Sequence, residues 1–504
     1  MRLRELIDGL DCVLVSGPLD QEVAGVQHDS RRVKVGDLFV SIKGLKYDGH
    51  DFIHEAFLRG ARAFVVERSD VAVPSDLTVI RVGCTRRALA YLSCRFYGEP
   101  SRRLTLIGVT GTNGKTTTTF LLESILKAAG RKVGLVGTVS YRFGGRERPA
   151  ERTTPEASDL QAFLAEILKQ GADSAVLEVS SHSLTLSRVE SLEFDGAVFT
   201  NLTQDHLDFH GSFEAYFQAK AKLFQSLGEG APKGVEKAAF LNADDPYADR
   251  IASLTRAKVY RYGVERRGDL TAEKVELSLE GIKGKVISPW GSFPFYSSLV
   301  GRHNLSNILA AVGVGLHLKV PPESVAEGIA QLQRVPGRFE KVEAGQPFGV
   351  VVDYAHTPDA LERVLKTAKG FCRGRLIAVF GCGGDRDRSK RPKMGEAAAR
   401  IADLVVLTSD NPRSEDPQRI IAEIEEGTKK VWRGGEGYVK IPDRRCAIEA
   451  ALSRAKPLDI VLIAGKGHET CQIIGERILP FDDREVARET LKALGGISVV
   501  KREE

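Results

Sequence analysis

RLTLIGVTGTNGKTTTTFLLESILKAAGRKVGLVGTV, residues 103–139, decides the fold of this chain. An apolar run leads into a glycine-rich turn, then into an amphipathic helical pattern, a stop at Gly130 and a second apolar run. This order predicts a strand–helix–strand unit, which implies a parallel sheet. Open parallel sheets bind ligands at the carboxyl ends of their strands. We therefore expect a ligand at the glycine-rich turn.

The turn contains Gly114-Lys115-Thr116, the ending of a phosphate-binding loop. Backbone N–H groups of such a turn point at phosphate oxygens, and the helix N-terminus adds partial positive charge. Lys115 is expected to bridge the β- and γ-phosphates of a nucleotide, and Thr116 to hold Mg²⁺. The motif G-x-x-x-x-G-K-[ST] is broken at its first glycine, where Val109 stands. The flanking strand and helix are those that the motif requires, so we predict nucleotide binding.

Three domains are expected, because 504 residues exceed what one hydrophobic core can organise. Short strand-like runs and a helix-like segment before residue 99 predict a small α/β domain. A second series of buried-strand runs, each ending in a polar motif, begins near residue 348, after Pro336 and Gly337 interrupt the pattern. We predict an α/β fold with a small N-terminal α/β domain at residues 1–98, a central P-loop parallel-sheet domain at 99–335 and a Rossmann-like α/β domain at 336–504.

Composition excludes several classes of protein. With 42% hydrophobic and 28% charged residues, the chain is of the ordinary globular type. A net charge of +5 gives no bulk argument for nucleic acid. The seven cysteines are scattered without a CxxC pair, which predicts neither disulfides nor zinc and favours the cytoplasm. Residues 3–10 have the apolar spacing of an amphipathic helix, and no segment approaches the ~20 apolar residues of a membrane span.

Two other apolar runs end in polar clusters that we expect beside the phosphate loop. One is DSAVLEVSSHS around Glu178, and the other is FDGAVFTNLTQDHLDFHG around Asp205 and His206. Mg²⁺ prefers oxygen ligands, so Glu178 is a suitable partner for Thr116 at a metal.

The chain resembles the Mur ligase family of peptidoglycan synthesis. The resemblance covers nearly the whole chain and is carried, in order, by GTNGKTT, EVSSHSL, TNLTQDHLDFHG, GRHNLSN, GRFE, DYAHTPD and SDNPR. It implies that ATP phosphorylates a substrate carboxylate and that an amine attacks the resulting acyl phosphate, giving an amide, ADP and phosphate. GDRDR and DNPR resemble the members that add meso-2,6-diaminopimelate to UDP-N-acetylmuramoyl-L-Ala-D-Glu.

The resemblance also implies the nucleotide and metal residues. ATP would be bound by Gly111, Thr112, Asn113, Gly114, Lys115, Thr116, Thr117, Asn304, Arg338, Asp353 and His356. Mg²⁺ would be held by Thr116, Glu178, His206 and a carbamylated Lys220, with Lys115, Lys220, His206 and Glu178 as the catalytic set. Carbamylation turns an ammonium into an anionic oxygen ligand, which suits Mg²⁺. Without the resemblance, Lys220 would be a solvated helix lysine, as Lys222 is expected to be.

Substrate residues follow from the same resemblance. Ser30 and the loop GLKYDGHDF, residues 44–52, would form the uridine diphosphate pocket of the N-terminal domain. The muramoyl-dipeptide would be held by Thr153, Thr154, Ser180 and Arg188, and diaminopimelate by Arg386, Asp410, Asn411, Pro412, Arg413, Gly465 and Glu469. The chain departs from the family at Leu186, where diaminopimelate enzymes carry Gln, and at Arg152, where Asn is usual.

The chemistry of the last set suits an amino-acid head group. A guanidinium binds a carboxylate, while carboxylate and amide oxygens accept from an ammonium. Meso-diaminopimelate has a second head of this kind, whereas L-lysine would leave Arg413 unpaired. DNPR is equally typical of a solvated turn when taken alone.

Other functions stay open at this point. They are an L-lysine-adding or D-Ala-D-Ala-adding Mur ligase, a folylpolyglutamate synthetase, and a P-loop ATPase acting on nucleic acid. The last would use the basic cluster Arg386, Arg388, Lys390, Arg391 and Lys393, which lacks interleaved aromatic residues. We expect a cytoplasmic monomer that uses ATP and Mg²⁺, binds no nucleic acid and does not insert into a membrane.

Overall fold

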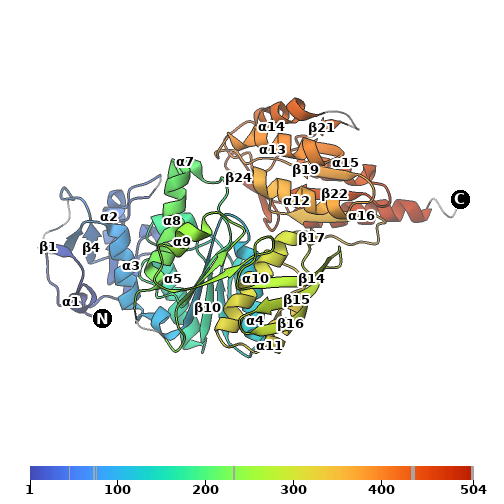
Figure 1. The fold of residues 1–504 in the computed structure, drawn as a ribbon. Helices are drawn as coiled ribbons and strands as arrows, with labels where there is room; N and C mark the ends of the chain where they lie inside the picture. Colours follow the sequence, from blue (N-terminus) through green and yellow to red (C-terminus); the bar gives the residue numbers. More distant parts are fainter. Residues whose placement is uncertain (45, 72–73, 75–76, 231–232, 433–436, 501–504) are drawn as a thin grey trace.

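The computed structural model describes residues 1–44, 46–71, 74, 77–230, 233–432 and 437–500 and has a three-domain α/β fold (Figure 1). The N-terminal sheet (blue), the central sheet (cyan to green) and the C-terminal sheet (orange to red) follow one another along the chain (Figure 1). The boundaries after residues 98 and 335 remain our proposal. Along the described residues, no helix has the length and apolar character of a membrane span.

The N-terminal sheet has five strands in the order β1-β5-β4-β3-β2. The strand-like runs GDLFVSI and ARAFVVE contain β3 and β4, as predicted. The predicted helix over residues 3–10 is wrong in extent, because α1 ends at Leu6 and Gly9 has a φ of +79° that a helix does not allow. The elements are α1 Leu3–Leu6, β1 Cys12–Ser16, β2 Gly25–Gln27, η1 Ser30–Arg32, β3 Asp37–Val40, α2 Ile53–Leu58, β4 Ala63–Val66, β5 Thr78–Val82 and α3 Thr85–Phe96.

The predicted strand–helix–strand unit is confirmed and forms the middle of an eight-stranded sheet. Its order is β13-β12-β11-β6-β10-β7-β8-β9, parallel from β13 to β7 and antiparallel beyond. The unit is β6 Thr105–Thr110, α4 Lys115–Ala128 and β7 Val133–Val136, with β10 Ser174–Glu178 between the two strands. The other elements are β8 Ser140–Phe143, β9 Arg146–Pro149, α5 Ala157–Lys169, α6 Ser181–Thr185, β11 Gly196–Phe199, α7 Leu207–His210, α8 Phe213–Leu227, β12 Ala238–Asn242, α9 Ala248–Ala252 and β13 Lys258–Tyr262.

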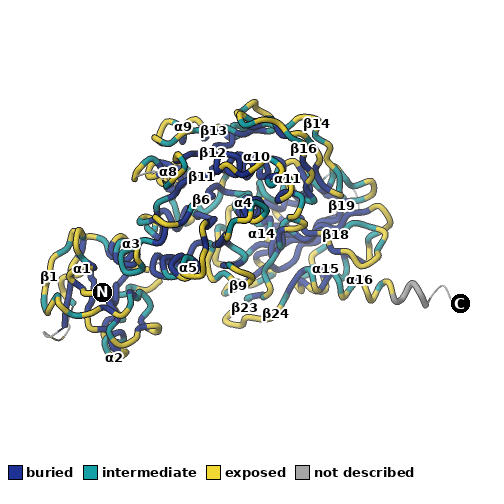
Figure 2. The backbone as a smooth tube through the Cα atoms, turned by 90° about the horizontal axis from the view of Figure 1, so that it is seen from below, coloured by how far each residue is buried: buried dark blue, intermediate teal, exposed yellow. Residues whose placement is uncertain are grey.

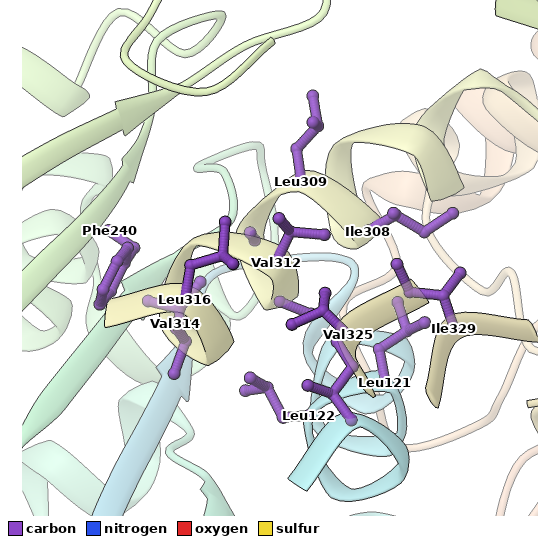
Figure 3. Packing of buried hydrophobic residues seen from close by; sticks show 14 of the residues in the cluster. Leu121, Leu122, Phe240, Ile308, Leu309, Val312, Val314, Leu316, Val325 and Ile329 are labelled. Atoms are coloured by element: carbon purple, nitrogen blue, oxygen red, sulfur yellow. The ribbon is translucent and has the colours of Figure 1, made fainter. Parts of the chain in front are cut away.

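The core of the central domain is built around helix α10, Arg302–His317, which is buried on nearly all sides. It packs against α4 and against α11, Pro322–Gln331 (Figure 3). Apolar side chains of these three helices face one another in Figure 3, among them Leu121, Leu122, Ile308, Val312, Val325 and Ile329. A three-stranded antiparallel sheet lies beyond them, with strands β14 Thr271–Leu277, β15 Ile282–Ser288 and β16 Gly291–Ser297. Burial of this apolar surface fixes α4, and with it the phosphate loop.

The C-terminal sheet has the order β17-β18-β22-β19-β20-β21 and is parallel except for β17. The predicted second α/β sheet is therefore confirmed, and its middle strands are buried (Figure 2). The strands are β17 Glu340–Lys341, β18 Gly349–Asp353, β19 Leu376–Phe380, β20 Leu404–Leu407, β21 Tyr438–Lys440 and β22 Ile460–Ala464, followed by the hairpin β23 Cys471–Ile474 and β24 Arg477–Pro480. The helices are α12 Pro358–Phe371, α13 Lys390–Ile401, α14 Pro417–Val431, α15 Arg444–Arg454 and α16 Asp483–Val500.

Helices α13 and α14 touch through glycines, which generates a stability prediction. A Cβ added at Gly427 would lie 1.7 Å from the carbonyl oxygen of Pro392, whereas a Cβ at Gly370 in α12 would meet nothing within 4 Å. Gly427→Ala should therefore force the helices apart and destabilise the C-terminal domain by roughly 1–3 kcal/mol. Gly370→Ala should stabilise it by up to about 1 kcal/mol, because Ala favours a helix.

Urea unfolding followed by the fluorescence of Trp432, in a Trp290→Phe background, checks this pair, since Trp432 directly follows α14. Equal midpoints for the two variants would contradict the close helix contact.

Candidate active site between the central and C-terminal sheets

The phosphate loop connects β6 to α4 and is built from glycines in left-handed or related conformations. Gly111 has a φ of +146° and Gly114 a φ of +88°. A Cβ at Gly111 would lie 1.8 Å from the hydroxyl of Thr200, and a Cβ at Gly114 would lie 2.5 Å from the Asn307 amide oxygen. Val109, the departure from the general motif, belongs to strand β6, so the turn begins after it. The sharp turn therefore depends on the glycines that the chain does have.

Two lysines meet at one carbonyl of this loop. Lys115 Nζ donates to the carbonyl oxygens of Gly111 and Thr112, at 3.0 and 2.9 Å, and Lys220 Nζ donates to Gly111 O at 2.8 Å. Lys220 extends from α8, lies over the ring of Tyr216 and is 1% exposed. Burial, and next the charge of Lys115, lower the pKa of Lys220 well below its ordinary value. Burial also lowers the pKa of Lys115.

Glu178 joins the loop to the neighbouring strand ends. Its carboxylate accepts from the Thr116 hydroxyl at 3.1 Å, and from the backbone N–H and the hydroxyl of Thr138 at 2.8 and 2.9 Å. Glu178 ends β10 and is fully buried. Thr138 follows β7, in the sequence Gly137-Thr138-Val139 at the end of the strand–helix–strand segment. It was not identified as a site residue from the sequence.

The donor set at Thr116 and Glu178 fits Mg²⁺. A buried carboxylate, two hydroxyls and no sulfur or imidazole within this group are the oxygen chemistry that the ion prefers. The described residues contain no cluster of three His, Cys, Asp or Glu side chains that would cage a metal alone. Mg²⁺ at a nucleotide commonly has one or two protein carboxylates and takes phosphate and water oxygens for the rest.

His206 lies in a cluster of aromatic rings that includes His182 and Tyr216, and its role at a metal stays a prediction. Its imidazole is 3.3 Å from the Asp205 carboxylate, and its ring centroid is 4.7 Å from that of His182. Burial, and next the charge of His206, lower the pKa of His182 to about 3. His182 therefore stays neutral at physiological pH, and an imidazole in this state can accept a hydrogen bond.

The C-terminal domain contributes Arg338 to the loop. Its guanidinium donates to Thr116 Oγ1 at 3.1 Å and lies 4.7 Å from the centroid of the Tyr354 ring. Asn113 in the loop donates to Asp359, at the start of α12, at 3.1 Å. These contacts bring the two domains together at the phosphate loop.

The remaining expected nucleotide residues line one cavity at this junction. The cavity is lined by residues that include Asn113, Gly114, Thr116, Thr117, Asn304, Arg338, Asp353 and His356. Asn304 Nδ2 donates to Val300 O, and Asn304 Oδ1 accepts from Asn307. Burial raises the pKa of Asp353, whose carboxylate accepts from the backbone N–H groups of Phe339 and Ala355. Gly111, Thr112 and Lys115 belong to the adjoining loop, which Lys220 contacts from α8.

The sequence missed Asn201, His303 and Asn307 in this cavity. Asn307 could have been found, because it lies three residues after Asn304 in the same motif and hence on the same helix face.

The expected dipeptide residues lie close to Glu178 and Thr138. Thr153 Oγ1 is 3.1 Å from Thr138 Oγ1, and Thr154 Oγ1 donates to Glu178 O at 2.7 Å. Ser180 N donates to Thr154 Oγ1, and Arg188 donates to Thr154 O. All four expected residues thus meet around one segment next to the metal-type site.

Arg152 and Arg188 also share Glu156, at 3.0 and 2.8 Å. Leu186 ends helix α6 as its C-cap, and nothing in its surroundings explains the change from Gln.

The N-terminal domain reaches this side through several contacts, among them an ion pair of Arg86 with Glu156 at 3.3 Å. His28 Nδ1 is 2.9 Å from Ser158 Oγ, and Arg32 is 2.8 Å from Asp159. Ser30, between them in sequence, is buried and donates to Glu55 at 2.9 Å. Of the expected loop at 44–52, Leu45 lies outside the described residues.

The expected amino-acid residues converge at the ends of β19, β20 and β22. Arg413 Nη1 donates to Gly384 O at 2.7 Å, which joins DNPR to GDRDR. Asn411 Nδ2 donates to Glu469 Oε2 at 2.8 Å, and a Cβ at Gly465 would come within 2.6 Å of Asp410 Oδ2. Pro412 is buried, whereas Arg386 is exposed at the rim and donates to Asp385 O.

We call this convergent set of residues the proposed amino-acid pocket, and two of its charged groups have no ion pair among the described residues. The carboxylate of Asp410 is 7% exposed and receives no hydrogen bond from the described part of the chain. The guanidinium of Arg413, which is half-buried, likewise makes no salt bridge there. Burial, and next the charge of Arg386, lower the pKa of Arg413, while the charges of Asp410 and Glu469 raise it.

Tyr354 stands between this pocket and the phosphate loop. Burial raises the pKa of Tyr354, and the charges of Glu469, Asp410 and Asp205 raise it further, whereas the charge of Arg338 lowers it. Tyr354 lines the nucleotide cavity, and a Cβ at Gly467 would lie 2.7 Å from Tyr354 Cβ, so Tyr354 adjoins both the cavity and the turn that follows β22. The sequence did not single out Tyr354, although it lies within the DYAHTPD motif.

Comparison with known proteins places this arrangement in a family. Three family models match in order: "Mur ligase family, catalytic domain" at residues 22–97, "Mur ligase middle domain" at 109–315 and "Mur ligase, glutamate ligase domain" at 337–467. A UDP-N-acetylmuramoyl-L-alanyl-D-glutamate–2,6-diaminopimelate ligase of Geobacillus thermodenitrificans is 46% identical, over 98% of this chain and 99% of the relative.

Two further relatives have the same name. The ligase of the same name from Bacillus velezensis is 48% identical, over 93% of this chain and 94% of the relative. A solved structure of a ligase with this name is 34% identical, with a TM-score of 0.68, over 98% of this chain and 99% of the other. The three family models and the relatives that match nearly the full length of the chain show the same family, and the phosphate loop with Arg338 is consistent with it. The chain belongs to the Mur ligase family.

Proposed function

We propose that this chain is an ATP-dependent ligase that adds meso-2,6-diaminopimelate to UDP-N-acetylmuramoyl-L-Ala-D-Glu, releasing ADP and phosphate. The observation that carries the proposal is the adjacency of two sites across Tyr354: a phosphate loop with Lys115, Thr116 and Arg338, and a pocket with an unpaired Asp410 and Arg413. The names of the relatives support the choice of substrates. Its seven free cysteines suit the cytoplasm that we propose for it. We further propose a monomer that binds no nucleic acid.

The chemistry requires a carboxylate to become an electrophile. A substrate carboxylate oxygen attacks the γ-phosphorus of ATP, the bond from that phosphorus to the β,γ-bridging oxygen breaks, and ADP leaves. Lys115 and Arg338 stand where the charge of the transferred group develops, and positioning with charge neutralisation is most of what phosphoryl transfer needs. Mg²⁺, when bound at Thr116 and Glu178, would neutralise further phosphate charge.

Amide formation follows in the same space. The amine nitrogen of the incoming amino acid attacks the acyl carbon, phosphate leaves with the carbon–oxygen bond pair, and the nitrogen loses a proton. Asp410 and Arg413 are suited to hold the far head of the amino acid, through its ammonium and its carboxylate. Thr153, Thr154, Ser180 and Arg188 would hold the dipeptide on the opposite side of Glu178.

The first test of the proposal concerns Lys220. Only a neutral amine combines with carbon dioxide, and burial shifts the pKa of Lys220 downward, which is the direction that favours the neutral form. Lys220→Ala should lower ligation by about 100-fold or more while the thermal midpoint of the protein stays close to that of the wild type. Lys222→Ala, an exposed lysine of the same helix, should change ligation less than twofold. Ligation by Lys220→Ala at the wild-type rate would refute the carbamate.

Lys115 provides a second test, which separates nucleotide from peptide binding. Lys115→Ala should reduce substrate-dependent phosphate release by roughly 10³-fold, because the transferred charge loses its cation. The Kd for the UDP-muramoyl-dipeptide, measured by calorimetry, should stay within about threefold, because Thr153 and Thr154 hold their contacts without Lys115. An equal loss of both affinities in a folded variant would contradict the separation of the two sites.

The choice of amino acid is tested at Arg413. We expect the wild type to prefer meso-diaminopimelate over L-lysine by about 10⁴-fold in kcat/KM, because L-lysine leaves Arg413 without a carboxylate. Arg413→Ala should reduce that ratio by at least about 100-fold. Arg388→Ala, an exposed arginine of the neighbouring loop, is the matched control and should keep the ratio. A wild-type enzyme that prefers L-lysine would overturn the assignment.

A further inference from the structure

Lys466 is a fully buried lysine inside the amino-acid pocket, on the turn that follows β22. The glycines on either side of it, Gly465 and Gly467, have φ values of +116° and +54°. A Cβ at Gly465 would come within 2.6 Å of Asp410 Oδ2, and a Cβ at Gly467 within 2.7 Å of Tyr354 Cβ. The turn is therefore packed tightly on both sides, and this packing holds Lys466 inward.

The ammonium of Lys466 binds two polar groups of the pocket. Its Nζ donates to Asn411 Oδ1 at 3.1 Å and to Glu469 Oε2 at 2.8 Å. Asn411 Oδ1 also accepts from the backbone N–H of Ile473 at 3.0 Å, and Asn411 Nδ2 donates to the same Glu469 oxygen at 2.8 Å. Both acceptor positions of the Asn411 amide oxygen are thus in use. Asn411 therefore orients Glu469, whose second oxygen is left for a ligand.

Lys466 also sets the charge of the pocket. Asp410 and Glu469 are its two carboxylates, and Arg413 and Lys466 its two cations. Arg386 and Asp385 are exposed at the rim, where solvent screens their charges, and the buried Arg444 is paired with Asp483 at 2.7 Å. The inner pocket is accordingly neutral, and without Lys466 it would have a net charge of −1.

We propose that Lys466 is a positioning residue that determines amino-acid specificity by keeping this pocket neutral. A neutral pocket suits the far head of an amino acid that has both an ammonium and a carboxylate, which pair with Asp410 and Arg413. A pocket with a net charge of −1 would instead accommodate a lone ammonium, because the second carboxylate could balance it. This inference rests on the proposed function, and it assigns to Lys466 the rejection of amino acids such as L-lysine.

Three substitutions separate charge from hydrogen bonding. Lys466→Gln keeps a donor for Asn411 and Glu469 without the charge, Lys466→Met removes both, and Lys466→Arg keeps both. Lys492→Met, an exposed lysine of α16, is the matched control. For each variant, kcat/KM is measured for meso-diaminopimelate and for L-lysine, together with KM for ATP and the thermal midpoint.

We expect the ratio of the two kcat/KM values to fall at least about tenfold in Lys466→Gln and Lys466→Met, with KM for ATP within about twofold. Lys466→Arg and Lys492→Met should keep the ratio. A wild-type ratio in Lys466→Gln, or the failure of both neutral variants to fold, overturns the inference, because Lys466 would then serve the fold alone. A wild-type chain that ligates neither amino acid to the UDP-dipeptide instead refutes the proposed function.

Discussion

The parallel pairing of β6 with β10 is the constraint on which the rest of the site depends. Its register sets Glu178 opposite Val109, two residues before Gly111. A parallel neighbour ends at the same edge of the sheet, so the carboxylate comes to the start of α4 and binds Thr116. Sliding this register by one residue would turn Glu178 to the other face of the sheet and remove it from the loop.

Hydrogen bonds connect Glu178 to the phosphate loop and to the proposed dipeptide residues. Thr138 binds the Glu178 carboxylate and approaches Thr153, while Thr154 binds the Glu178 carbonyl. Glu178 therefore binds Thr116 of the proposed metal site with its side chain, and it connects to the proposed dipeptide residues through Thr138 and through its own backbone carbonyl. With ATP at the loop and the dipeptide at the proposed residues, this arrangement would bring the phosphoryl donor close to the carboxylate acceptor, which is the proximity that the proposed reaction needs.

Burial is the largest cause of the lowered pKa values of Lys115, Lys220 and His182 in the same region. Lys115 and Lys220 approach one carbonyl oxygen, and low solvent access makes both ammonium forms costly. His182 is held neutral for the same reason. Anionic ligands relieve this repulsion, so the loop is suited to phosphate before any ligand contact is considered.

The local pattern of the sequence determined the strand–helix–strand unit, the glycine-rich turn and the polar motifs at the strand ends, because these features depend on residues close together in the chain. It also indicated the family motifs from Gly111 to Glu469. The tertiary structure alone decided that β10 lies between β6 and β7, that Tyr354 separates two pockets, and that Lys466 points inward between Asn411 and Glu469. Strand order and side-chain burial arise from packing between segments far apart in sequence, and no local periodicity records which segments will meet.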